Sequence, residues 1–252
     1  MSDWWKSFFD ADYVRIWSEF VSADKTAGEV EGLWQLLALQ EGSRVLDAPC
    51  GYGRLSRPLA ERGCRVLGVD QSEVLLQHAE SRRGELSPER LRYLRHDLRL
   101  PLPEDGFDVA INVFSSLGYG TEAEDVAILR NLRGAVRPGG LVLVETMHRD
   151  LTVLNMLRNP PSMRLPDGTL VVQEVRFDSI AGSAEPCWYW SGPNGSGSKS
   201  AAFRVYAATE LVALVARAGL RFVSAHRGCS TEPFKAEPPD MGGRLAILAR
   251  RD

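Results

Sequence analysis

Residues 43–54, Ser-Arg-Val-Leu-Asp-Ala-Pro-Cys-Gly-Tyr-Gly-Arg, constrain the fold of this chain more than any other stretch. An apolar pair comes directly before Asp47, two glycines follow at Gly51 and Gly53, and apolar residues then recur at helical spacing. This order predicts a buried strand, a tight glycine turn and a helix that begins beneath the turn. Because glycine has no Cβ, such a turn lets main-chain N–H groups and the start of a helix approach a ligand.

A second apolar run, residues 65–69, ends in Asp70. An acidic side chain at the end of the second strand of such a unit is placed to accept hydrogen bonds from a ribose diol. The glycine turn and Asp70 together predict a nucleoside-binding site.

Strands and helices are expected to alternate as far as residue 147. Further strands are predicted at 91–95, 107–114 and 141–145, and helices at 73–83 and 122–136. This alternation predicts an α/β fold with a parallel sheet covered by helices on both faces. Ligands of such sheets bind outside the carboxyl ends of the strands. Four positions are expected at that edge: Asp47, Asp70, Asp97 and residues 112–114.

The segments on either side of this core have different patterns. Phe9, Tyr13, Trp17 and Phe20 recur at helical spacing, which predicts one amphipathic helix that packs on the domain and is able to close over a ligand. A second helix is expected at 26–40. After residue 150 we predict a short helix at 151–157, strands at 169–177, 186–191 and 201–206, a flexible Gly/Ser-rich loop at 192–200, a helix at 209–219, and strands at 220–226 and 244–249.

Composition excludes several classes of function. The net charge of −3 gives no basic surface for nucleic acid, and no apolar stretch approaches the roughly 20 residues that span a bilayer. The N-terminus has no signal-peptide pattern, and the four cysteines form no C-x-x-C pair. We therefore expect a cytoplasmic protein without a zinc site, a disulfide framework, a nucleic-acid partner or a membrane partner.

The motifs of residues 43–147, and the layout of 209–250, resemble the class I S-adenosylmethionine-dependent methyltransferases. Asp47, Gly51 and Gly53 match the family motif acidic-x-Gly-x-Gly-x-Gly, with Pro49 in place of the first glycine. The Pro-Cys-Gly-Tyr-Gly-Arg form of this motif is similar to that of a bacterial branch that acts on small molecules. Ser-Leu-Gly-Tyr at 116–119 and Arg-Pro-Gly-Gly at 137–140 are two further points of resemblance.

The resemblance implies a Rossmann-like sheet that ends in an antiparallel hairpin, within a single domain of residues 1–252. Its expected parts are an N-terminal helical lid (1–40), a cofactor-binding core (43–147), an antiparallel β insertion on the acceptor side (160–207), and a C-terminal helix and β-hairpin (209–250). The insertion is too small to bury a core of its own.

The resemblance also implies S-adenosylmethionine as the cofactor and S-adenosylhomocysteine as the product. Asp47 and the backbone of Gly51 and Gly53 would hold the methionine amino end, and Asp70 would bind the ribose hydroxyls. The remaining implied cofactor contacts are Gln71 beside Asp70, Asp97 at the adenine amine, Leu98 on the adenine ring, Asn112, Val113 and Phe114 along the floor, Tyr52 and Arg54 near the carboxylate, and Tyr13 and Trp17 from the N-terminal side.

Two other functions use the same strand and turn. A nicotinamide dehydrogenase normally shows G-x-G-x-x-G, and its pyrophosphate would be repelled by Asp47, whereas a carboxylate suits a cationic methionine amine. A non-catalytic or regulatory protein that binds S-adenosylmethionine would keep the same pocket, and it stays an alternative. We favour in-line methyl transfer to a small organic acceptor, at O or N in preference to C.

A sulfonium is already an activated electrophile, so a catalytic base is optional. His148, which follows the fifth strand, is the first choice for a base, with an orienting or solvated histidine as the alternative. Tyr119, Trp188, Trp190 and Tyr206 are predicted to line the acceptor site. Glu145 has no second carboxylate at ligand spacing, so no metal is expected. A monomer or a homodimer, paired through edge strands of the insertion, is predicted.

Overall fold

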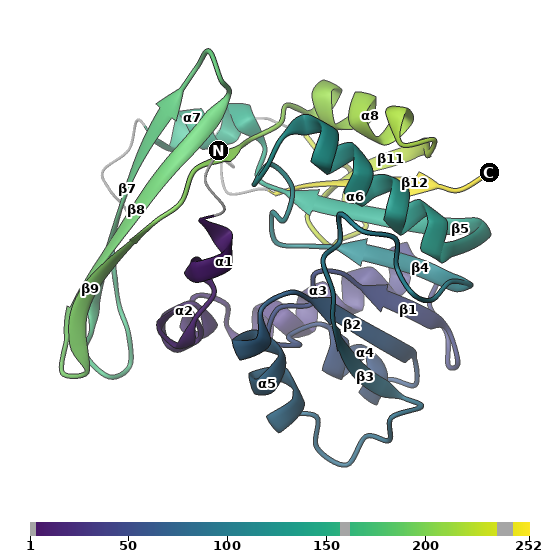
Figure 1. Ribbon diagram of the computed structural model, residues 1–252, viewed down its shortest axis with the longest axis horizontal. Coiled ribbons are helices and arrows are strands. Elements are labelled where there is room, and N and C mark those ends of the chain that lie inside the picture. Colours follow the sequence, from purple (N-terminus) through teal and green to yellow (C-terminus); the bar gives the residue numbers. More distant parts are fainter. Residues whose placement is uncertain (1–3, 157–161, 236–243) are drawn as a thin grey trace.

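The computed structural model describes residues 4–156, 162–235 and 244–252, and their largest element is a seven-stranded sheet (Figure 1). Its strands lie in the order β11-β12-β5-β4-β1-β2-β3. Strands β1 to β5 are parallel, β12 is antiparallel to β5, and β11 is antiparallel to β12. The predicted Rossmann-like sheet with a terminal hairpin is confirmed. The bounds are β1 Arg44–Asp47, β2 Arg65–Asp70, β3 Leu91–Arg95, β4 Phe107–Asn112, β5 Val136–Thr146, β11 Arg221–Arg227 and β12 Leu245–Arg250.

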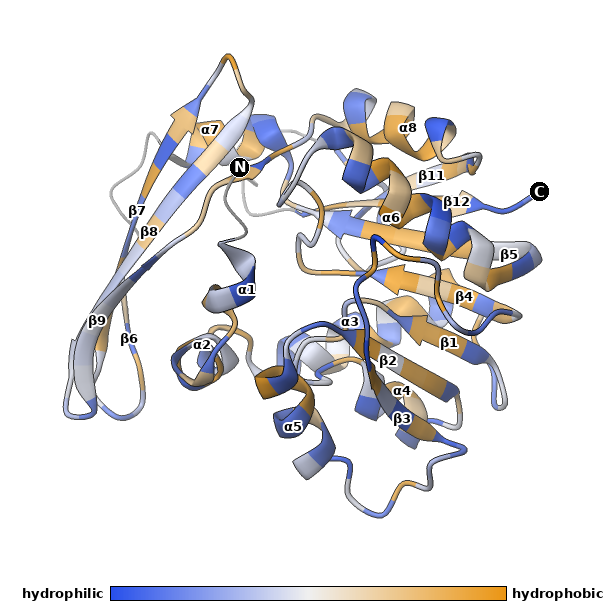
Figure 2. Ribbon diagram, viewed as in Figure 1, coloured by the Kyte–Doolittle hydropathy of each residue, from blue (hydrophilic) through white to orange (hydrophobic). Residues whose placement is uncertain are grey.

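Helices cover both faces of this sheet, whose central strands are strongly apolar (Figure 2). Side chains such as Leu129 and Leu211 pack with Leu46 on one face, while Leu33 and Leu59 pack with Val45 on the other. Neighbouring residues of a strand point to opposite faces, so a strand buried on both sides is apolar at successive positions. The helices are α3 (Ala23–Leu36), α4 (Ser56–Glu61), α5 (Glu73–Ser81), α6 (Glu122–Ala135) and α8 (Ala208–Arg217).

The N-terminal aromatic segment is not the single helix that its spacing predicts. It forms α1 (Trp5–Phe8), α2 (Ala11–Trp17) and a 3₁₀ turn at Ser18–Phe20. The break lies at Asp10, whose backbone is extended and whose side chain accepts a hydrogen bond from the Tyr13 N–H. Aspartate is among the best N-cap residues, so it begins a new helix here instead of continuing the first.

The segment after β5 forms α7 (Arg149–Met156) and a second, antiparallel sheet of β6 (Ser162–Arg164), β7 (Leu170–Asp178), β8 (Ser183–Gly192), β9 (Gly195–Ser200) and β10 (Phe203–Arg204). The prediction of a flexible loop at 192–200 is wrong, because β9 pairs with β8 along its whole length. Gly and Ser are poor strand formers, but backbone pairing with β8 outweighs that local preference. The predicted strand at 201–206 is only the two residues of β10.

Some positions of the predicted lid, short helix, insertion and C-terminal part lie outside the described residues, namely 1–3, 157, 160, 161 and 236–243. All four cysteines are free. Within the described ranges, no helix has the length and apolarity needed to cross a membrane, and no cluster of three His, Cys, Asp or Glu side chains could hold a metal ion.

Candidate functional site

A pocket lies at the carboxyl ends of β1, β2 and β4, where the sequence places its acidic residues. The glycine turn and the strand ends form its inner wall, and the N-terminal aromatic segment forms its outer wall. Predicted cofactor residues that line it are Tyr13, Trp17, Asp47, Gly51, Tyr52, Arg54, Asp70, Gln71, Asp97, Leu98, Val113 and Phe114.

Asp47, at the end of β1, is buried at the base of the pocket. Its Oδ2 accepts a 2.5 Å hydrogen bond from Ser56 Oγ. Burial raises the pKa of Asp47 to about 7, against the opposing effects of the Ser56 hydrogen bond and the Arg54 charge. Removing a carboxylate from water destabilises its ionised form. A cation that binds next to Asp47 would therefore offset much of the free energy lost by burying the charge.

The glycine turn approaches its neighbours closely. Gly51 and Gly53 have φ angles of +56° and +78°, in the left-handed region that other residues avoid. A Cβ at Gly53 would overlap the Tyr93 hydroxyl, so Gly53 is constrained by packing as well as by backbone conformation. Gly53 supports the turn from behind and is not part of the pocket lining.

Asp70, at the end of β2, is held in place by two backbone donors. Its Oδ2 accepts from the Gly51 N–H at 2.9 Å, and its Oδ1 accepts from the Ser72 N–H at 2.8 Å. Burial raises its pKa, while these backbone hydrogen bonds act in the opposite direction. Each carboxylate oxygen has a further lone pair, so Asp70 is able to accept two hydroxyl hydrogen bonds from a diol.

Asp97 and Leu98 lie at the far end of the pocket, after β3. Arg99 binds Asp97 through Nε and Nη2 and binds Glu124 through Nη1. The Arg99 hydrogen bond lowers the pKa of Asp97, with burial acting against it. The Arg99 guanidinium also lies 5.0 Å from the Trp5 ring centroid, so a cation joins the N-terminal segment to this end of the pocket.

Strained backbone forms the floor of the pocket after β4. Phe114 and Ser115 have φ angles of +75° and +62°. The Phe114 N–H donates to Glu145 Oε2 at 2.7 Å. Glu145 is buried and forms an ion pair with the partly exposed Arg244, whose guanidinium lies 4.9 Å from the Phe114 ring. These contacts hold Phe114 in a conformation that costs on the order of 1–3 kcal/mol elsewhere. Asn112 is not in the lining, because its Nδ2 donates to the Ala48 carbonyl at 2.7 Å and fixes the end of β1.

Four aromatic residues of the N-terminal segment line the outer side of the pocket: Trp5, Phe9, Tyr13 and Trp17. Tyr13 stacks on Trp17 with centroids 5.0 Å apart, and burial raises the pKa of Tyr13 well above its usual range. The segment is fixed to the core where Ser72 Oγ donates to the Phe9 carbonyl at 2.8 Å.

Comparison with known proteins agrees with this geometry. Residues 45–140 match the family model described as a methyltransferase domain. Residues 45–140 carry a methyltransferase domain. The predicted resemblance to S-adenosylmethionine-dependent methyltransferases is confirmed, and so is the predicted cofactor at the level of the family. The resemblance to a small-molecule branch with the Pro-Cys-Gly-Tyr-Gly-Arg motif stays a prediction.

Known relatives of the methyltransferase domain differ in how much of this chain they cover. Glycine N-methyltransferase of Mus musculus is 31% identical over 159 residues, which is 57% of this chain and 54% of that protein. The chain spans 54–60% of the length of the first curated relatives it matches. The superposition with the CcbJ methyltransferase of Streptomyces caelestis covers 98% of this chain and 98% of that one, with a TM-score of 0.79 and 18% identity. S-adenosylmethionine-bound CalS10, an amino pentose methyltransferase of Micromonospora echinaspora, has a TM-score of 0.70 and 19% identity, over 96% of this chain and 97% of its own. At these identities the two structures show a shared fold.

His148, which follows β5, does not lie where a base is expected. It is buried outside the pocket lining, and its Nε2 accepts from the Ala208 N–H at 3.2 Å. Burial lowers its pKa, and its ring lies 5.1 Å from Phe234. This arrangement supports a structural contact at the start of α8 and does not support the predicted role of a base.

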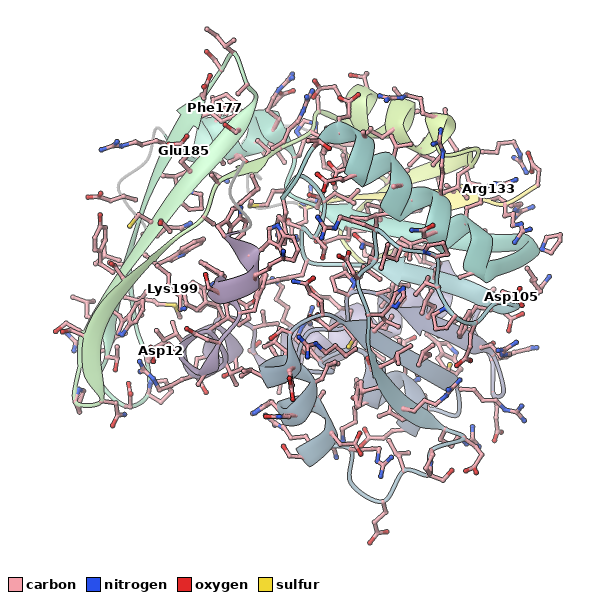
Figure 3. All side chains as sticks on the ribbon, in the orientation of Figure 1. Asp12, Asp105, Arg133, Phe177, Glu185 and Lys199 are labelled. Atoms are coloured by element: carbon pink, nitrogen blue, oxygen red, sulfur yellow. The ribbon has the colours of Figure 1, made fainter. Side chains whose placement is uncertain are left out.

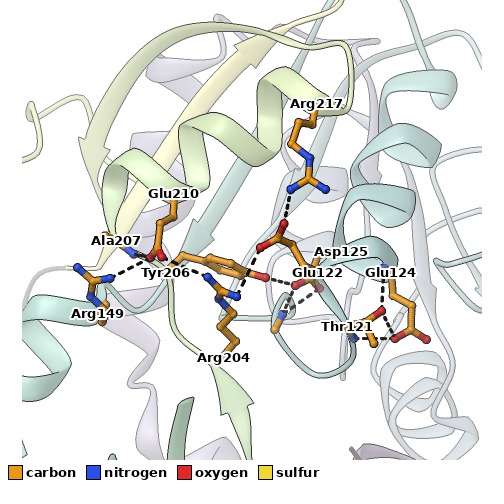
Figure 4. A network of polar contacts seen from close by, with 11 residues as sticks. Thr121, Glu122, Glu124, Asp125, Arg149, Arg204, Tyr206, Ala207, Glu210 and Arg217 are labelled. Atoms are coloured by element: carbon orange, nitrogen blue, oxygen red, sulfur yellow. Dashed lines mark hydrogen bonds and ion pairs between the residues drawn. The ribbon is translucent and has the colours of Figure 1, made fainter. Parts of the chain in front are cut away.

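The four predicted acceptor residues lie in two places. Tyr119 lines the pocket, beside the Trp4 ring at 4.9 Å. Trp188 and Trp190 belong to the second sheet and pack in the same aromatic cluster as the N-terminal segment, outside the pocket lining. Tyr206 is buried, and its hydroxyl donates to Asp125 Oδ2 at 2.5 Å in the polar network of Figure 4. The expectation that all four would face the acceptor is not supported for Trp188, Trp190 and Tyr206.

Several residues of the site have no signal in the sequence motifs. Arg99 reaches the pocket from the loop after β3, and Glu124 and Asp125 reach it from α6. Arg244, the residue before β12, supports Phe114. Each contact joins positions far apart along the chain. Only the acidic start of α6, which follows an N-cap at Thr121, could have drawn attention to Glu124.

Proposed function

We propose that this protein is an S-adenosylmethionine-dependent methyltransferase that transfers a methyl group to a small organic acceptor. The observation that carries this proposal is the pair of buried carboxylates, Asp47 and Asp70, at the ends of adjacent strands of one pocket. When bound, the cofactor supplies a methyl group on an electrophilic sulfonium. The protein therefore has to orient two reactants, exclude water and, for some acceptors, receive a proton.

The residues of the pocket fit this cofactor in three respects. Asp47 offers a carboxylate for the methionine ammonium, and Asp70 offers unused lone pairs for the ribose hydroxyls. Leu98 offers an apolar surface for adenine. A dinucleotide would bring its pyrophosphate next to Asp47, where two negative groups repel each other.

We propose nitrogen as the favoured acceptor atom, with oxygen second. The outer wall of the pocket is aromatic. Burial raises the pKa values of Tyr13 in this wall and of Tyr119 in the loop after β4, so their hydroxyls serve poorly as bases. A neutral amine carries its own lone pair and needs no base, unlike a hydroxyl group. Glycine N-methyltransferase and the amino pentose methyltransferase CalS10, which this chain resembles, provide further support.

Isothermal titration with S-adenosylmethionine and, separately, NADH tests the proposal. The Asp70→Ala variant should bind S-adenosylmethionine about 1–3 kcal/mol more weakly than the wild type, the scale of a lost charged hydrogen-bond partner. Asp105→Ala, at the opposite edge of the sheet (Figure 3), should bind as the wild type does. Release of S-adenosylhomocysteine in the presence of small amines would then separate an enzyme from a non-catalytic binding protein. Binding of NADH alone would refute the proposal.

A further inference from the structure

The N-terminal segment that closes the pocket also packs against the second sheet. Figure 1 shows α1 and α2 between β7–β9 and the large sheet. The Trp188 ring of β8 lies 5.5 Å from Phe8 and 5.2 Å from Trp17. These aromatic contacts bury apolar surface area. Because the hydrophobic effect is not directional, such packing alone tolerates small shifts of one element against the other.

Lys199 of β9 adds a directional contact to this packing. It lies opposite Trp188 in the strand register, and only 11% of its side chain is exposed. Its Nζ donates to Asp10 Oδ2 at 2.7 Å and lies 5.5 Å from the Phe8 ring centroid. A lysine buried to this degree needs a charge partner, and Asp10 provides it.

Asp10 uses its two carboxylate oxygens for two different elements. Oδ1 accepts from the Tyr13 N–H at 3.0 Å and caps α2, while Oδ2 accepts from Lys199. Burial acts to raise the pKa of Asp10, but the hydrogen bonds from Lys199 and Tyr13 lower it overall. One ionised carboxylate therefore joins β9 to the first turn of the helix that carries Tyr13 and Trp17 into the pocket.

We propose that Lys199 is a positioning residue for the cofactor pocket. Through Asp10 it fixes the start of α2, so that Tyr13 and Trp17 stay over the bound cofactor, and it links the β insertion to cofactor binding. This inference rests on the proposed function for its ligand. Its structural part, the fixing of α2 by β9, does not depend on any ligand.

Two readouts test the inference: the dissociation constant of S-adenosylhomocysteine by titration calorimetry, and amide hydrogen exchange of α2 in the unliganded protein. Lys199→Met keeps the length of the side chain and removes the charge. Asp10→Asn also removes the pair but keeps an N-cap, since asparagine caps as well as aspartate. Each variant should bind the ligand about 3- to 10-fold more weakly. The reason is that the apparent affinity falls with the fraction of protein in which α2 holds Tyr13 and Trp17 over the pocket. Each should also exchange α2 amides faster, with β4 exchange unchanged.

Matched variants separate positioning from a general loss of stability. The double variant Lys199→Met with Asp10→Asn should be no weaker than either single variant, since both remove the same pair. Lys199→Arg should restore binding, and Lys25→Met, an exposed lysine of α3, should leave both readouts unchanged. If the wild type does not bind the ligand, the proposed function fails, and α2 exchange still decides the structural part. Wild-type affinity together with wild-type α2 exchange in Lys199→Met would overturn the inference.

Discussion

Cofactor affinity should fall as pH falls below neutrality, and Asp47 should be the reason. Burial raises the pKa of this carboxylate to about 7 in the free protein. A ligand ammonium pairs with the ionised form, so binding at lower pH first has to remove a proton from Asp47. The affinity is therefore lost on the acid side of the pKa and is fully present above it.

The size of the effect follows from the titration of one group. Apparent affinity scales with the ionised fraction of Asp47, which is about one-eleventh at pH 6 and about nine-tenths at pH 8 for a pKa of about 7. The dissociation constant should therefore rise about 10-fold between these two conditions, or about 1.4 kcal/mol. Near pH 7, where about half of the Asp47 carboxyls carry a proton, binding should release about half a proton.

Calorimetry with S-adenosylhomocysteine in buffers of different ionisation enthalpy measures both quantities. Asp47→Asn should bind weakly and lose the pH dependence between about pH 6 and pH 8. Ser56→Ala keeps Asp47 but removes the 2.5 Å hydrogen bond that stabilises its carboxylate, so it should move the midpoint to higher pH. Asp70, whose pKa is also raised by burial, faces the same pocket, and the Asp47→Asn profile separates its contribution. A wild-type affinity that is flat over this range, with no proton released, would refute the reasoning.

Two substitutions, together with one control in an exposed helix, test the loop and network beside the pocket. Gly118→Ala should destabilise the fold by about 2 kcal/mol or more in urea unfolding, because φ is +89° and a Cβ would overlap the Arg204 carbonyl. Gly134→Ala, in exposed helix with open space around it, should instead stabilise by about 0.5–1 kcal/mol, and equal effects of the two would contradict this account. Tyr206→Phe should cost about 1–3 kcal/mol by removing the donor to Asp125. Burial raises the pKa of Asp125 to about 6, so the stability that its neutral form contributes is lost as pH rises through 6. The Tyr206 hydroxyl stabilises the ionised form of Asp125, so Tyr206→Phe should cost more stability at about pH 8 than at about pH 5. Thermal unfolding at both pH values would contradict this if the cost were larger at about pH 5.

The sequence determined the large sheet and the inner wall of the pocket. Their signals are local: apolar strands, glycines that must adopt positive φ, and acidic residues that end β1 and β2 or closely follow β3. Topology rules then bring the carboxyl ends of parallel strands to one edge, so Asp47, Asp70 and Asp97 meet without any knowledge of side-chain contacts.

The tertiary structure decided the outer wall and the role of each residue beyond the core. The position of His148 after the fifth strand placed it near the acceptor, but its partner, the Ala208 N–H, lies 60 residues away along the chain. The segment at 192–200 is a strand because β8 offers it a pairing edge, although its own residues favour a loop. Lys199 meets Asp10 across 189 residues. Such contacts arise only when separate elements pack together, and no periodicity or motif within a single segment encodes them.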